Sequence, residues 1–360
     1  IKKTCTDESH SHRQRISFFN PQIPRYIYQK CFMSAGYASR LSAYSNKGVC
    51  GLPENFDTKR SLDLKLKKLS KVINEAKHVV VMTGAGISTG AGIPDFRGPK
   101  GVWTLEKQKQ KKSKKDAKKN QSINANSDCN GNKAATTSPS LSKKRSHAEM
   151  ESFHNHDNDF ASAKPTLTHR AITRLIQDES IQFCVTQNVD GLHRRSGLKR
   201  KNLAILHGCV FTEKCEQCGT EHFRDYDVGG MSFQLTGRTC EHGCKKGGLR
   251  DTLLDWEDEL PKYDFERAGQ ECAKADLCIC LGTSLRIEPA GSLPTYAKKF
   301  VIVNLQETPY DGRAEFVVRA PVDVVMRDVM KRQGYGASWE NEEMPAVETW
   351  SEDCSDFLSK

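Results

Sequence analysis

The 360-residue sequence has no run of about 18 apolar residues, the length that a helix needs to cross a lipid bilayer, so no membrane span is predicted. Its first residues are polar and lack the apolar segment of a secretory leader. Hydrophobic residues are also scarce, at 37%, and the mean hydropathy is -0.64. These values are low for a chain that packs throughout, and we therefore expect a folded core with sizeable unpacked segments.

Cysteine, in contrast, is abundant. The chain has 14 cysteines, and without a secretory leader a disulfide framework is not expected. Four of them form two close pairs, Cys215 with Cys218 and Cys240 with Cys244. Two such pairs can close a tetrahedral zinc site, and four thiolates leave no position for water, so this zinc would be structural. The alternatives are buried core cysteines or a disulfide pair, and His242 could replace one thiolate.

Positive charge is concentrated in one segment. The net charge is +10, and the run 107–119 consists mostly of lysine, followed by an Asn/Ser-rich stretch and the cluster Ser142-Lys-Lys-Arg-Ser146. Because no apolar periodicity is present, residues 107–163 are predicted to be a disordered basic insertion. Two interpretations of the lysines stay open: a solvated charged linker, or a nuclear-import and nucleic-acid patch, which the pairing of the clusters favours.

Outside the insertion, short apolar runs alternate with amphipathic segments. We expect strands at 79–82, 181–185, 277–281 and 300–303, and helices at 62–76, 166–178, 265–275 and 322–333. This alternation is typical of the α/β class, with a Rossmann-like parallel sheet covered by helices on both faces. The cysteine-rich segment interrupts the alternation as a small separate module.

A glycine-rich turn follows the first predicted strand. Gly84 and Gly86 allow a tight turn and close approach of a pyrophosphate, whose charge is favoured at a helix N-terminus. Alone this signal is weak, because a plain strand-to-helix turn can contain the same residues. The next loop adds Asp95, Phe96 and Arg97. Arg97 suits a phosphate or ribose, and Phe96 can shield a reactive sugar carbon from water.

Polar side chains also follow the second predicted strand. Gln187, Asn188 and Asp190 come just after its carboxyl end, the edge at which parallel sheets bind ligands. Amide groups can hold ribose hydroxyls and a carboxamide. His207, followed by Gly208, can take a proton near neutral pH. A structural histidine is the alternative interpretation of His207, and the motifs on either side of it disfavour that alternative.

Taken in order, these motifs resemble the signatures of the sirtuin family. They are Gly84-Ala-Gly-Ile-Ser88, Gly92-Ile-Pro-Asp-Phe-Arg-Gly98, Thr186-Gln-Asn-Val-Asp-Gly-Leu-His193, His207-Gly208, Gly282-Thr-Ser-Leu285 and Val303-Asn-Leu-Gln306. The resemblance covers roughly residues 37–334 apart from the insertion. The Trp103 segment, the run Leu254-Asp-Trp-Glu-Asp258 and the last motif look like the nuclear, chromatin-associated class IV branch.

The resemblance implies an NAD-dependent protein lysine deacylase that consumes NAD and holds one structural zinc. It implies that His207 is the general base and that Asn188 and Asp190 lie at the nicotinamide ribose and carboxamide. Further cofactor contacts are implied for Gly84, Ala85, Gly86, Thr89, Asp95, Phe96, Arg97, Trp103, Gln187, Gly282, Thr283, Ser284, Asn304, Leu305, Gln306 and Val322.

The implied reaction removes an acetyl group, or a longer acyl chain, from a protein lysine and releases nicotinamide and 2′-O-acyl-ADP-ribose. Histone tails are the implied substrates and the nucleus is the implied location. The basic insertion could add a salt-dependent contact to DNA or a nucleosome. Trp256, Glu257 and Asp258 either line the acyl or peptide channel or begin a surface helix. A protein mono-ADP-ribosyltransferase and an NAD-sensing chromatin module with weak turnover are the alternative functions.

The expected domain organisation follows from these features. Residues 1–36 are predicted to be a disordered N-terminal extension, because they lack a pattern. The catalytic domain is expected at 37–106 and 164–334, with the zinc module at about 209–250. Residues 335–360 are expected to be a patternless acidic tail.

Overall fold

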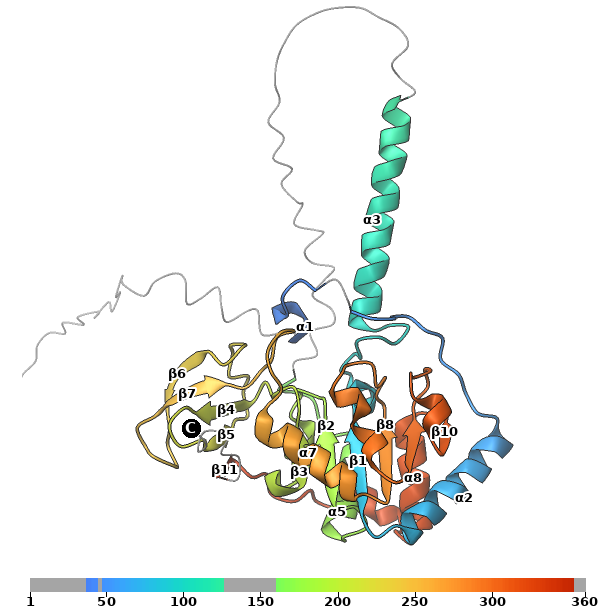
Figure 1. Cartoon of the computed structure of the whole chain (residues 1–360), viewed down its shortest axis with the longest axis vertical. Helices are drawn as coiled ribbons and strands as arrows, with labels where there is room; N and C mark the ends of the chain where they lie inside the picture. Colours follow the sequence, from blue (N-terminus) through green and yellow to red (C-terminus); the bar gives the residue numbers. More distant parts are fainter. Residues whose placement is uncertain (1–36, 45–46, 126–159, 353–360) are drawn as a thin grey trace, which may run out of the picture. The chain divides into compact units, whose positions relative to one another are not determined.

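The structure, a computed structural model, describes residues 37–44, 47–125 and 160–352. Its larger sheet has six strands in the order β10-β9-β8-β1-β2-β3, all paired in parallel (Figure 1). These strands are β1 (Val79–Thr83), β2 (Phe183–Thr186), β3 (Leu203–Ile205), β8 (Leu277–Leu281), β9 (Phe300–Val303) and β10 (Phe316–Val318). If the strands of the cysteine-rich module are left out, the order becomes 3-2-1-4-5-6, that of the doubly wound nucleotide-binding folds.

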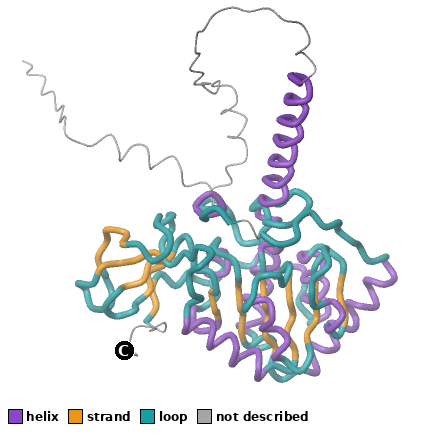
Figure 2. Tube along the Cα trace, turned by 45° about the horizontal axis from the view of Figure 1, so that its top comes forward, coloured by secondary structure: helices purple, strands orange, loops and turns teal. Residues whose placement is uncertain are grey.

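The central strands are apolar along their whole length because both faces of the sheet are covered. Every residue of β1 and β8 is buried. Along β1, Val79 and Val81 pack into one hydrophobic cluster, whereas Val80 and Met82 pack into another on the opposite face. The predicted Rossmann-like parallel sheet is therefore confirmed, and its helices lie on both sides (Figure 2).

Three helices cover the first face and one helix with a 3-10 segment covers the second. The first set is α2 (Lys59–Glu75), α5 (Leu167–Gln177) and α8 (Val322–Arg332), and the second is α7 (Lys262–Lys274) with η5 (Ala290–Tyr296). These helices match the predicted ones to within a few residues. The Thr166 side chain caps α5 by accepting from the His169 backbone N–H, as its position before the helix predicts.

The cysteine-rich module is a second sheet inserted between β3 and α7. It has five strands in the order β11-β5-β4-β7-β6, all paired antiparallel. The strands are β4 (Thr212–Cys215), β5 (Glu221–Phe223), β6 (Leu235–Thr239), β7 (Gly248–Asp251) and β11 (Trp350–Ser351). The first four fall where the zinc module was expected.

The beginning of the predicted insertion is helical, and this corrects the sequence-based expectation. Helix α3 spans Val102–Ala125, so the residues from 107 onward do not lack regular structure as predicted. The reason is that Lys, Gln and Ala are strong helix formers, and a helix that is polar all round needs no apolar stripe. The side chains at 107–115 are exposed. The rest of the insertion up to 159 lies outside the described residues.

The start of the expected acidic tail is also ordered, and here too the expectation was wrong. Residues 335–352 are called the C-terminal strap below. They pack against the helices α5 and α8 beside the parallel sheet and against the edge of the antiparallel sheet. Trp339 is buried in the cluster formed with α5 and α8, and Arg170 donates to the Glu342 carbonyl. Strand β11 then pairs with β5 at the edge of the cysteine-rich sheet. Residues 353–360 of the predicted tail, and the predicted extension 1–36, lie outside the described residues.

The remaining short elements complete the described part of the chain. They are α1 (Tyr37–Arg40), α6 (Leu192–Arg195), η1 (Ala85–Ile87), η2 (Thr89–Ala91), η4 (Arg200–Asn202), η6 (Asp311–Arg313) and η7 (Ala337–Asn341). Within the described ranges, no helix combines the length and apolarity that crossing a bilayer requires.

Candidate active site

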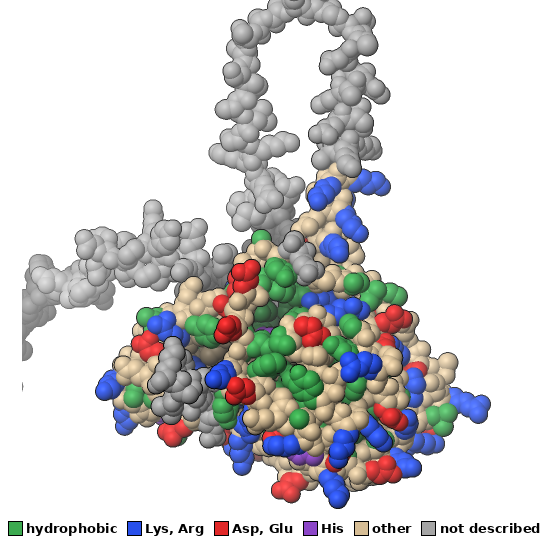
Figure 3. Space-filling view, in the orientation of Figure 1, with side chains coloured by type: hydrophobic (Ala, Val, Ile, Leu, Met, Phe, Trp, Pro, Cys, Tyr) green, Lys and Arg blue, Asp and Glu red, His purple; other side chains and the backbone are tan. Residues whose placement is uncertain are grey.

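A large cavity opens at the carboxyl ends of β1, β2, β3, β8 and β9. It encloses about 1690 Å³, more than the 300–1,000 Å³ that is typical for one small ligand. Figure 3 shows apolar side chains gathered on the face of the domain beneath the base of α3. Of the residues singled out from the sequence, the cavity is lined by Gly84, Ala85, Gly86, Asp95, Phe96, Arg97, Trp103, Gln187, Asn188, Asp190, His207, Gly282, Thr283, Ser284, Asn304 and Gln306.

Three predicted cofactor residues do not line this cavity. Thr89 is exposed, and its hydroxyl donates to the Gly86 carbonyl. The carbonyl of Leu305 accepts from the Asn55 N–H, and Val322 is buried in the core at the start of α8. The structure therefore brings most, but not all, of the predicted residues together.

The glycine-rich turn is not the plain strand-to-helix turn of the alternative interpretation. After β1 the chain forms two 3-10 turns, η1 and η2, and the next α-helix, α3, begins only at Val102. The glycines are needed for close packing: a Cβ on Gly84 would lie 2.7 Å from Thr283 Cβ, and one on Gly86 would lie 2.8 Å from Gly282 Cα. The turns after β1 and β8 therefore touch directly at the point where the strand order reverses.

A buried hydrogen-bond network connects the β1 turn with the loop after β2. The Asn188 side-chain amide donates to the Gly84 carbonyl at 3.1 Å and to the Ser88 hydroxyl at 3.2 Å. The Ser88 hydroxyl in turn donates to Asp190 at 2.6 Å, and the Leu192 N–H donates to the other oxygen of that carboxylate. Burial raises the pKa of Asp190, and these donors counteract the rise. Ser88 closes one of the signature motifs, but the sequence did not indicate its role in the network.

His207 is held in one tautomer. Its Nδ1 lies 3.1 Å from the Gln187 carbonyl, which can only accept, so Nδ1 carries the proton and Nε2 is left as an acceptor. Burial lowers the pKa of His207 to about 4, so the ring is neutral at pH 7. Gly208 has φ of +77°, and a Cβ there would lie 1.8 Å from the Thr252 carbonyl oxygen, so no other residue fits behind the histidine.

The loop after the glycine turn supplies charge of both signs. The Arg97 Nε donates to the Lys47 carbonyl, and the guanidinium lies 4.5 Å from the centre of the Trp103 ring. Burial lowers the pKa of Arg97 to about 10, which still leaves it charged at pH 7. The Gly98 N–H donates to Asp95, whose pKa is raised by burial.

Aromatic rings form one wall of the cavity. Trp103 lies 4.6 Å from Phe96 and 5.1 Å from Trp256 between ring centres, and Tyr44 stacks on Trp256 at 4.7 Å. Trp256, Glu257 and Asp258 form a turn that lines the cavity, so the channel interpretation of this segment agrees with the structure and the surface-helix interpretation does not. Tyr37 and Tyr44 had no signal in the sequence, because they precede the first periodic segment.

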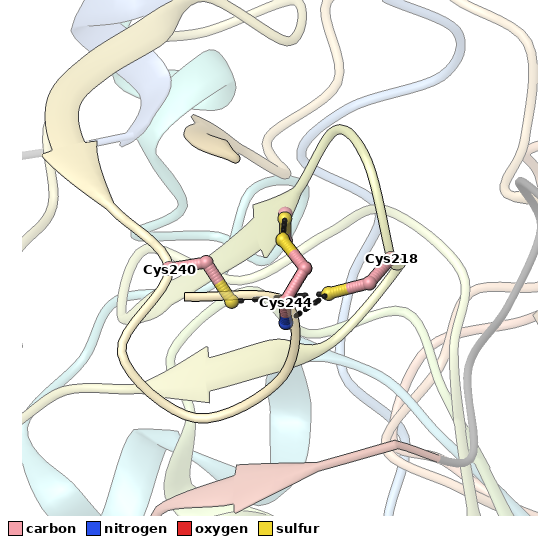
Figure 4. Close-up of side chains that lie close together, drawn as sticks. Cys218, Cys240 and Cys244 are labelled. Atoms are coloured by element: carbon pink, nitrogen blue, oxygen red, sulfur yellow. Dashed lines mark hydrogen bonds between the residues drawn. The ribbon is translucent and has the colours of Figure 1, made fainter. Parts of the chain in front are cut away.

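The four paired cysteines converge at the end of the antiparallel sheet (Figure 4). Their sulfur atoms lie within 4.8 Å of one another, with 3.6 Å between Cys215 and Cys244 and 3.8 Å between Cys218 and Cys240. These separations exceed a disulfide bond and match the edge, about 3.8 Å, of a tetrahedron with zinc–sulfur bonds of about 2.3 Å. The sulfurs of Cys218 and Cys244 also accept backbone N–H groups, as thiolate ligands do.

The residues present fit both groups that the sequence implies. Arg97 offers the cavity a cation suited to a pyrophosphate, and Gln187, Asn188 and Asn304 offer amides suited to ribose and carboxamide groups. The cavity lies at the reversal of strand order, where dinucleotides bind in this topology. The four sulfurs suit zinc, and the neighbouring group of His222, Glu241 and His242 is a poorer candidate because Arg224 already pairs with Glu241.

Fold and site together define a class: a Rossmann-like α/β domain with an inserted four-cysteine module and a large cavity at the switch point of its sheet. A family model described as "Sir2 family" matches residues 84–129 and 130–289 of the chain. The chain is a member of the Sir2 family, the sirtuins, as the motifs predicted.

Curated relatives agree with this assignment. The chain is 40% identical over 303 residues to "NAD-dependent protein deacetylase SRT1" of Arabidopsis thaliana, covering 83% of this chain and 55% of that protein. It is 38% identical over 313 residues to "NAD-dependent protein deacetylase Sirt6" of Drosophila melanogaster, covering 84% and 86%. The chain thus spans little more than half the length of the Arabidopsis relative and of its rice counterpart. The Sirt6 and sirtuin-7 names among the relatives fit the predicted class IV branch.

Two solved structures have the same fold. One is a Sir2 variant with a deacetylated p53 peptide and 3′-O-acetyl-ADP-ribose, at 29% identity and a TM-score of 0.50, covering 75% of this chain and 99% of that chain. The other is an ADP-ribose complex of a Sir2 homologue, at 27% identity and a TM-score of 0.50, covering 75% and 98%.

Proposed function

We propose that this chain is an NAD-dependent protein lysine deacylase that releases nicotinamide and 2′-O-acyl-ADP-ribose. The observation that carries the proposal is His207, a neutral histidine whose Nδ1 proton is fixed on the Gln187 carbonyl and whose Nε2 is free to accept a proton. It lines the same cavity as Asn188 and Asp190. The names of the Arabidopsis and Drosophila relatives support the same activity.

As co-substrate, NAD would supply an electrophilic ribose carbon, whose bond to nicotinamide breaks as the acyl oxygen of the substrate lysine bonds to it. His207 Nε2 would then take the proton of a ribose hydroxyl, which becomes the nucleophile toward the acyl carbon; water adds, and the lysine nitrogen leaves as the free amine. Asn188 and Asp190 orient the ribose and the carboxamide through the network that Ser88 completes. Arg97 holds the phosphates, and Phe96 and Trp103 keep water away from the reacting carbon. The four cysteines hold a structural zinc.

The proposed substrates are acyl-lysines of histone tails, and the proposed location is the nucleus. The aromatic wall of Phe96, Trp103 and Trp256 offers apolar contacts to an acyl chain longer than acetyl. The solved Sir2 variant with a deacetylated p53 peptide supports a peptide substrate.

The exposed lysines of α3 support a contact to DNA. They are Lys107, Lys109, Lys111, Lys112, Lys114 and Lys115, and no acidic residue lies among them. A rigid row of cations at the cavity's edge can neutralise phosphates beside a histone tail. Lys109 itself lines the cavity.

The test is nicotinamide release from NAD, measured with and without acetyl-lysine and long-acyl-lysine histone peptides. Release that depends on the acylated peptide, with 2′-O-acyl-ADP-ribose as co-product, is the expected result. Release without acyl-lysine would instead indicate a mono-ADP-ribosyltransferase, and NAD binding without release would indicate a sensing module.

A further inference from the structure

Strand β3 is an edge strand of the parallel sheet, and the chain runs from its end to His207. Its inner edge pairs with β2, and the pairing continues one residue further through the Leu206 N–H and the Thr186 carbonyl. Residues 203 and 205 therefore direct their main-chain groups to the outer edge, where no further strand of the sheet follows. Unsatisfied groups at this buried edge would be costly.

Two buried side chains satisfy this edge in place of a strand. The Arg200 Nη1 donates to the Leu203 carbonyl, and the Ile205 N–H donates to Asp264 Oδ1 at 3.2 Å. Ile205 is the last residue of β3 and lies two positions before His207. The hydrogen bonds at both ends of the strand's open edge thus come from one ion pair.

The ion pair itself is fully connected. Arg200 Nη1 and Nη2 donate to the two oxygens of Asp264, both at 2.8 Å. Its Nε and Nη2 donate to the two oxygens of Glu221, at 2.8 Å and 3.0 Å. With the Leu203 carbonyl, these bonds use all five N–H groups of the guanidinium. Burial alone would raise the pKa of Glu221, but the charge and hydrogen bonds of Arg200 hold it at about 2.

The two carboxylates come from different parts of the fold. Glu221 belongs to β5 of the cysteine-rich sheet, whereas Asp264 lies in the first turn of α7, whose Lys262 and Phe265 line the cavity (Figure 1). Asp264 also accepts a hydrogen bond from the β3 backbone, whereas the hydrogen bonds described for Glu221 come from Arg200, so the two carboxylates share one arginine but differ in their bonding to the strand before His207.

We propose that Asp264, held in place by Arg200, is a positioning residue for the reaction: it closes the open edge of β3 and thereby fixes the strand that presents His207. The proposal rests on the proposed function, because it assumes that His207 is the general base. Glu221 anchors the same arginine to the cysteine-rich sheet and accepts its hydrogen bonds from Arg200 rather than from β3, so it serves as the matched control.

The test compares Asp264→Ala with Glu221→Ala, since each removes one carboxylate from Arg200. Both variants should lower the Tm. Asp264→Ala should also lower kcat about tenfold with little change in the Kd for NAD, because His207 loses its placement. Glu221→Ala should keep kcat within about twofold. Asp264→Asn should recover most of kcat, because its amide oxygen can still accept from the Ile205 N–H. Equal kcat losses in the two alanine variants, or equal losses in Asp264→Ala and Asp264→Asn, would overturn the proposal.

Hydrogen exchange on the unmodified chain provides a second test if Asp264→Ala does not fold. The Ile205 amide should exchange as slowly as the Leu206 amide, which pairs with β2, although Ile205 faces the sheet edge. Fast exchange at Ile205 would overturn the proposal without any variant. An absence of acyl-dependent nicotinamide release in the unmodified chain would overturn the proposed function instead and leave the exchange result standing.

Discussion

The Ser88 hydroxyl donates a 2.6 Å hydrogen bond to the Asp190 carboxylate in the interior of the domain. Both side chains are buried, and the bond joins the turn after β1 to the loop after β2. Because the same hydroxyl accepts from the Asn188 amide, it sets the positions of Asn188 and Asp190, two of the three predicted catalytic side chains, at once.

Replacing this hydroxyl should therefore impair turnover. Ser88→Ala removes a hydrogen bond to a charged group, worth about 1.5–3 kcal/mol, so nicotinamide release should fall about tenfold to hundredfold. The pKa of Asp190, already raised by burial, should rise further. Ser292→Ala is the control, since the Ser292 hydroxyl donates to the Pro289 carbonyl just before η5. An unchanged rate in Ser88→Ala would separate Ser88 from the mechanism.

Loss of the His207 ring should abolish the reaction but not the fold. In His207→Ala, nicotinamide release can still depend on the acylated peptide, but the reaction should stop before 2′-O-acyl-ADP-ribose forms. Formation of that product should fall at least about hundredfold. Product is measured by mass spectrometry, and folding by Tm and zinc content. His78→Ala, which removes a histidine paired with Glu271 on the surface, controls for loss of an imidazole elsewhere. Near-normal product formation in His207→Ala would exclude His207 as the base.

Stability should depend on pH through buried histidines. Burial lowers the pKa of His193 to about 3, of His207 to about 4, and of His169 well below its usual value. In the unfolded chain the histidine pKa is near 6.5. Between the lowered pKa values and pH 6.5, the unfolded chain therefore binds more protons than the folded chain, so the stability that is present above about pH 6.5 is lost as pH falls. The free energy of unfolding should drop by about 2 kcal/mol per histidine from pH 6.5 to 5.

Urea denaturation at pH 5, 6 and 7 measures this effect. The double variant His169→Gln with His193→Gln leaves the active-site histidine in place and should flatten the pH dependence. The same slope in the double variant and in the unmodified chain would mean that other groups cause the acid sensitivity.

The cysteine module should depend on zinc and on the glycines packed against its sulfurs. Cys215→Ser should release zinc and lower Tm. Gly247→Ala should weaken zinc binding as well, because a Cβ there would lie 2.5 Å from the Cys215 sulfur. Zinc content is measured by atomic emission after dialysis against a chelator, with Cys50→Ser, outside the cluster, as the control. Full zinc retention in Cys215→Ser would contradict the metal site.

The lysines of α3 should make DNA binding depend on salt. Replacing Lys111, Lys112, Lys114 and Lys115 by Ala should reduce the slope of log K against log salt by up to about 3.6, if each contacts one phosphate. Fluorescence anisotropy with duplex DNA measures the slope. Lys67→Ala with Lys71→Ala on α2 is the control, since these lysines pair with Asp63 and Glu75. An unchanged slope in the α3 variant would favour the solvated-linker interpretation.

The fold could be predicted where the sequence pattern is local and long enough. The strands at 79–82 and 277–281 are uninterrupted apolar runs, and both were found in the sheet. The cysteine pairs and the glycine turn were likewise visible, because their spacing alone limits what they can form. Strands β3 and β10 have only three residues each, too few for a period to appear.

Other features depend on contacts between distant residues, which no local pattern contains. Trp339 becomes buried only because α5 and α8 lie beside it, and Tyr44 finds its stacking partner, Trp256, more than two hundred positions away. The role of Ser88 requires the meeting of two loops separated by 102 positions. Helix α3 was missed for another reason: the segment has no apolar periodicity, which predicts disorder, although its lysines also favour a helix.

The C-terminal strap bears on how the protein behaves at high concentration. By pairing with β5, β11 occupies an edge of the antiparallel sheet whose N–H and carbonyl groups would otherwise be open to strands of other molecules. A chain cut before residue 350 would expose that edge. It should therefore form oligomers and precipitate more readily than the longer chain, even where its catalytic residues are intact.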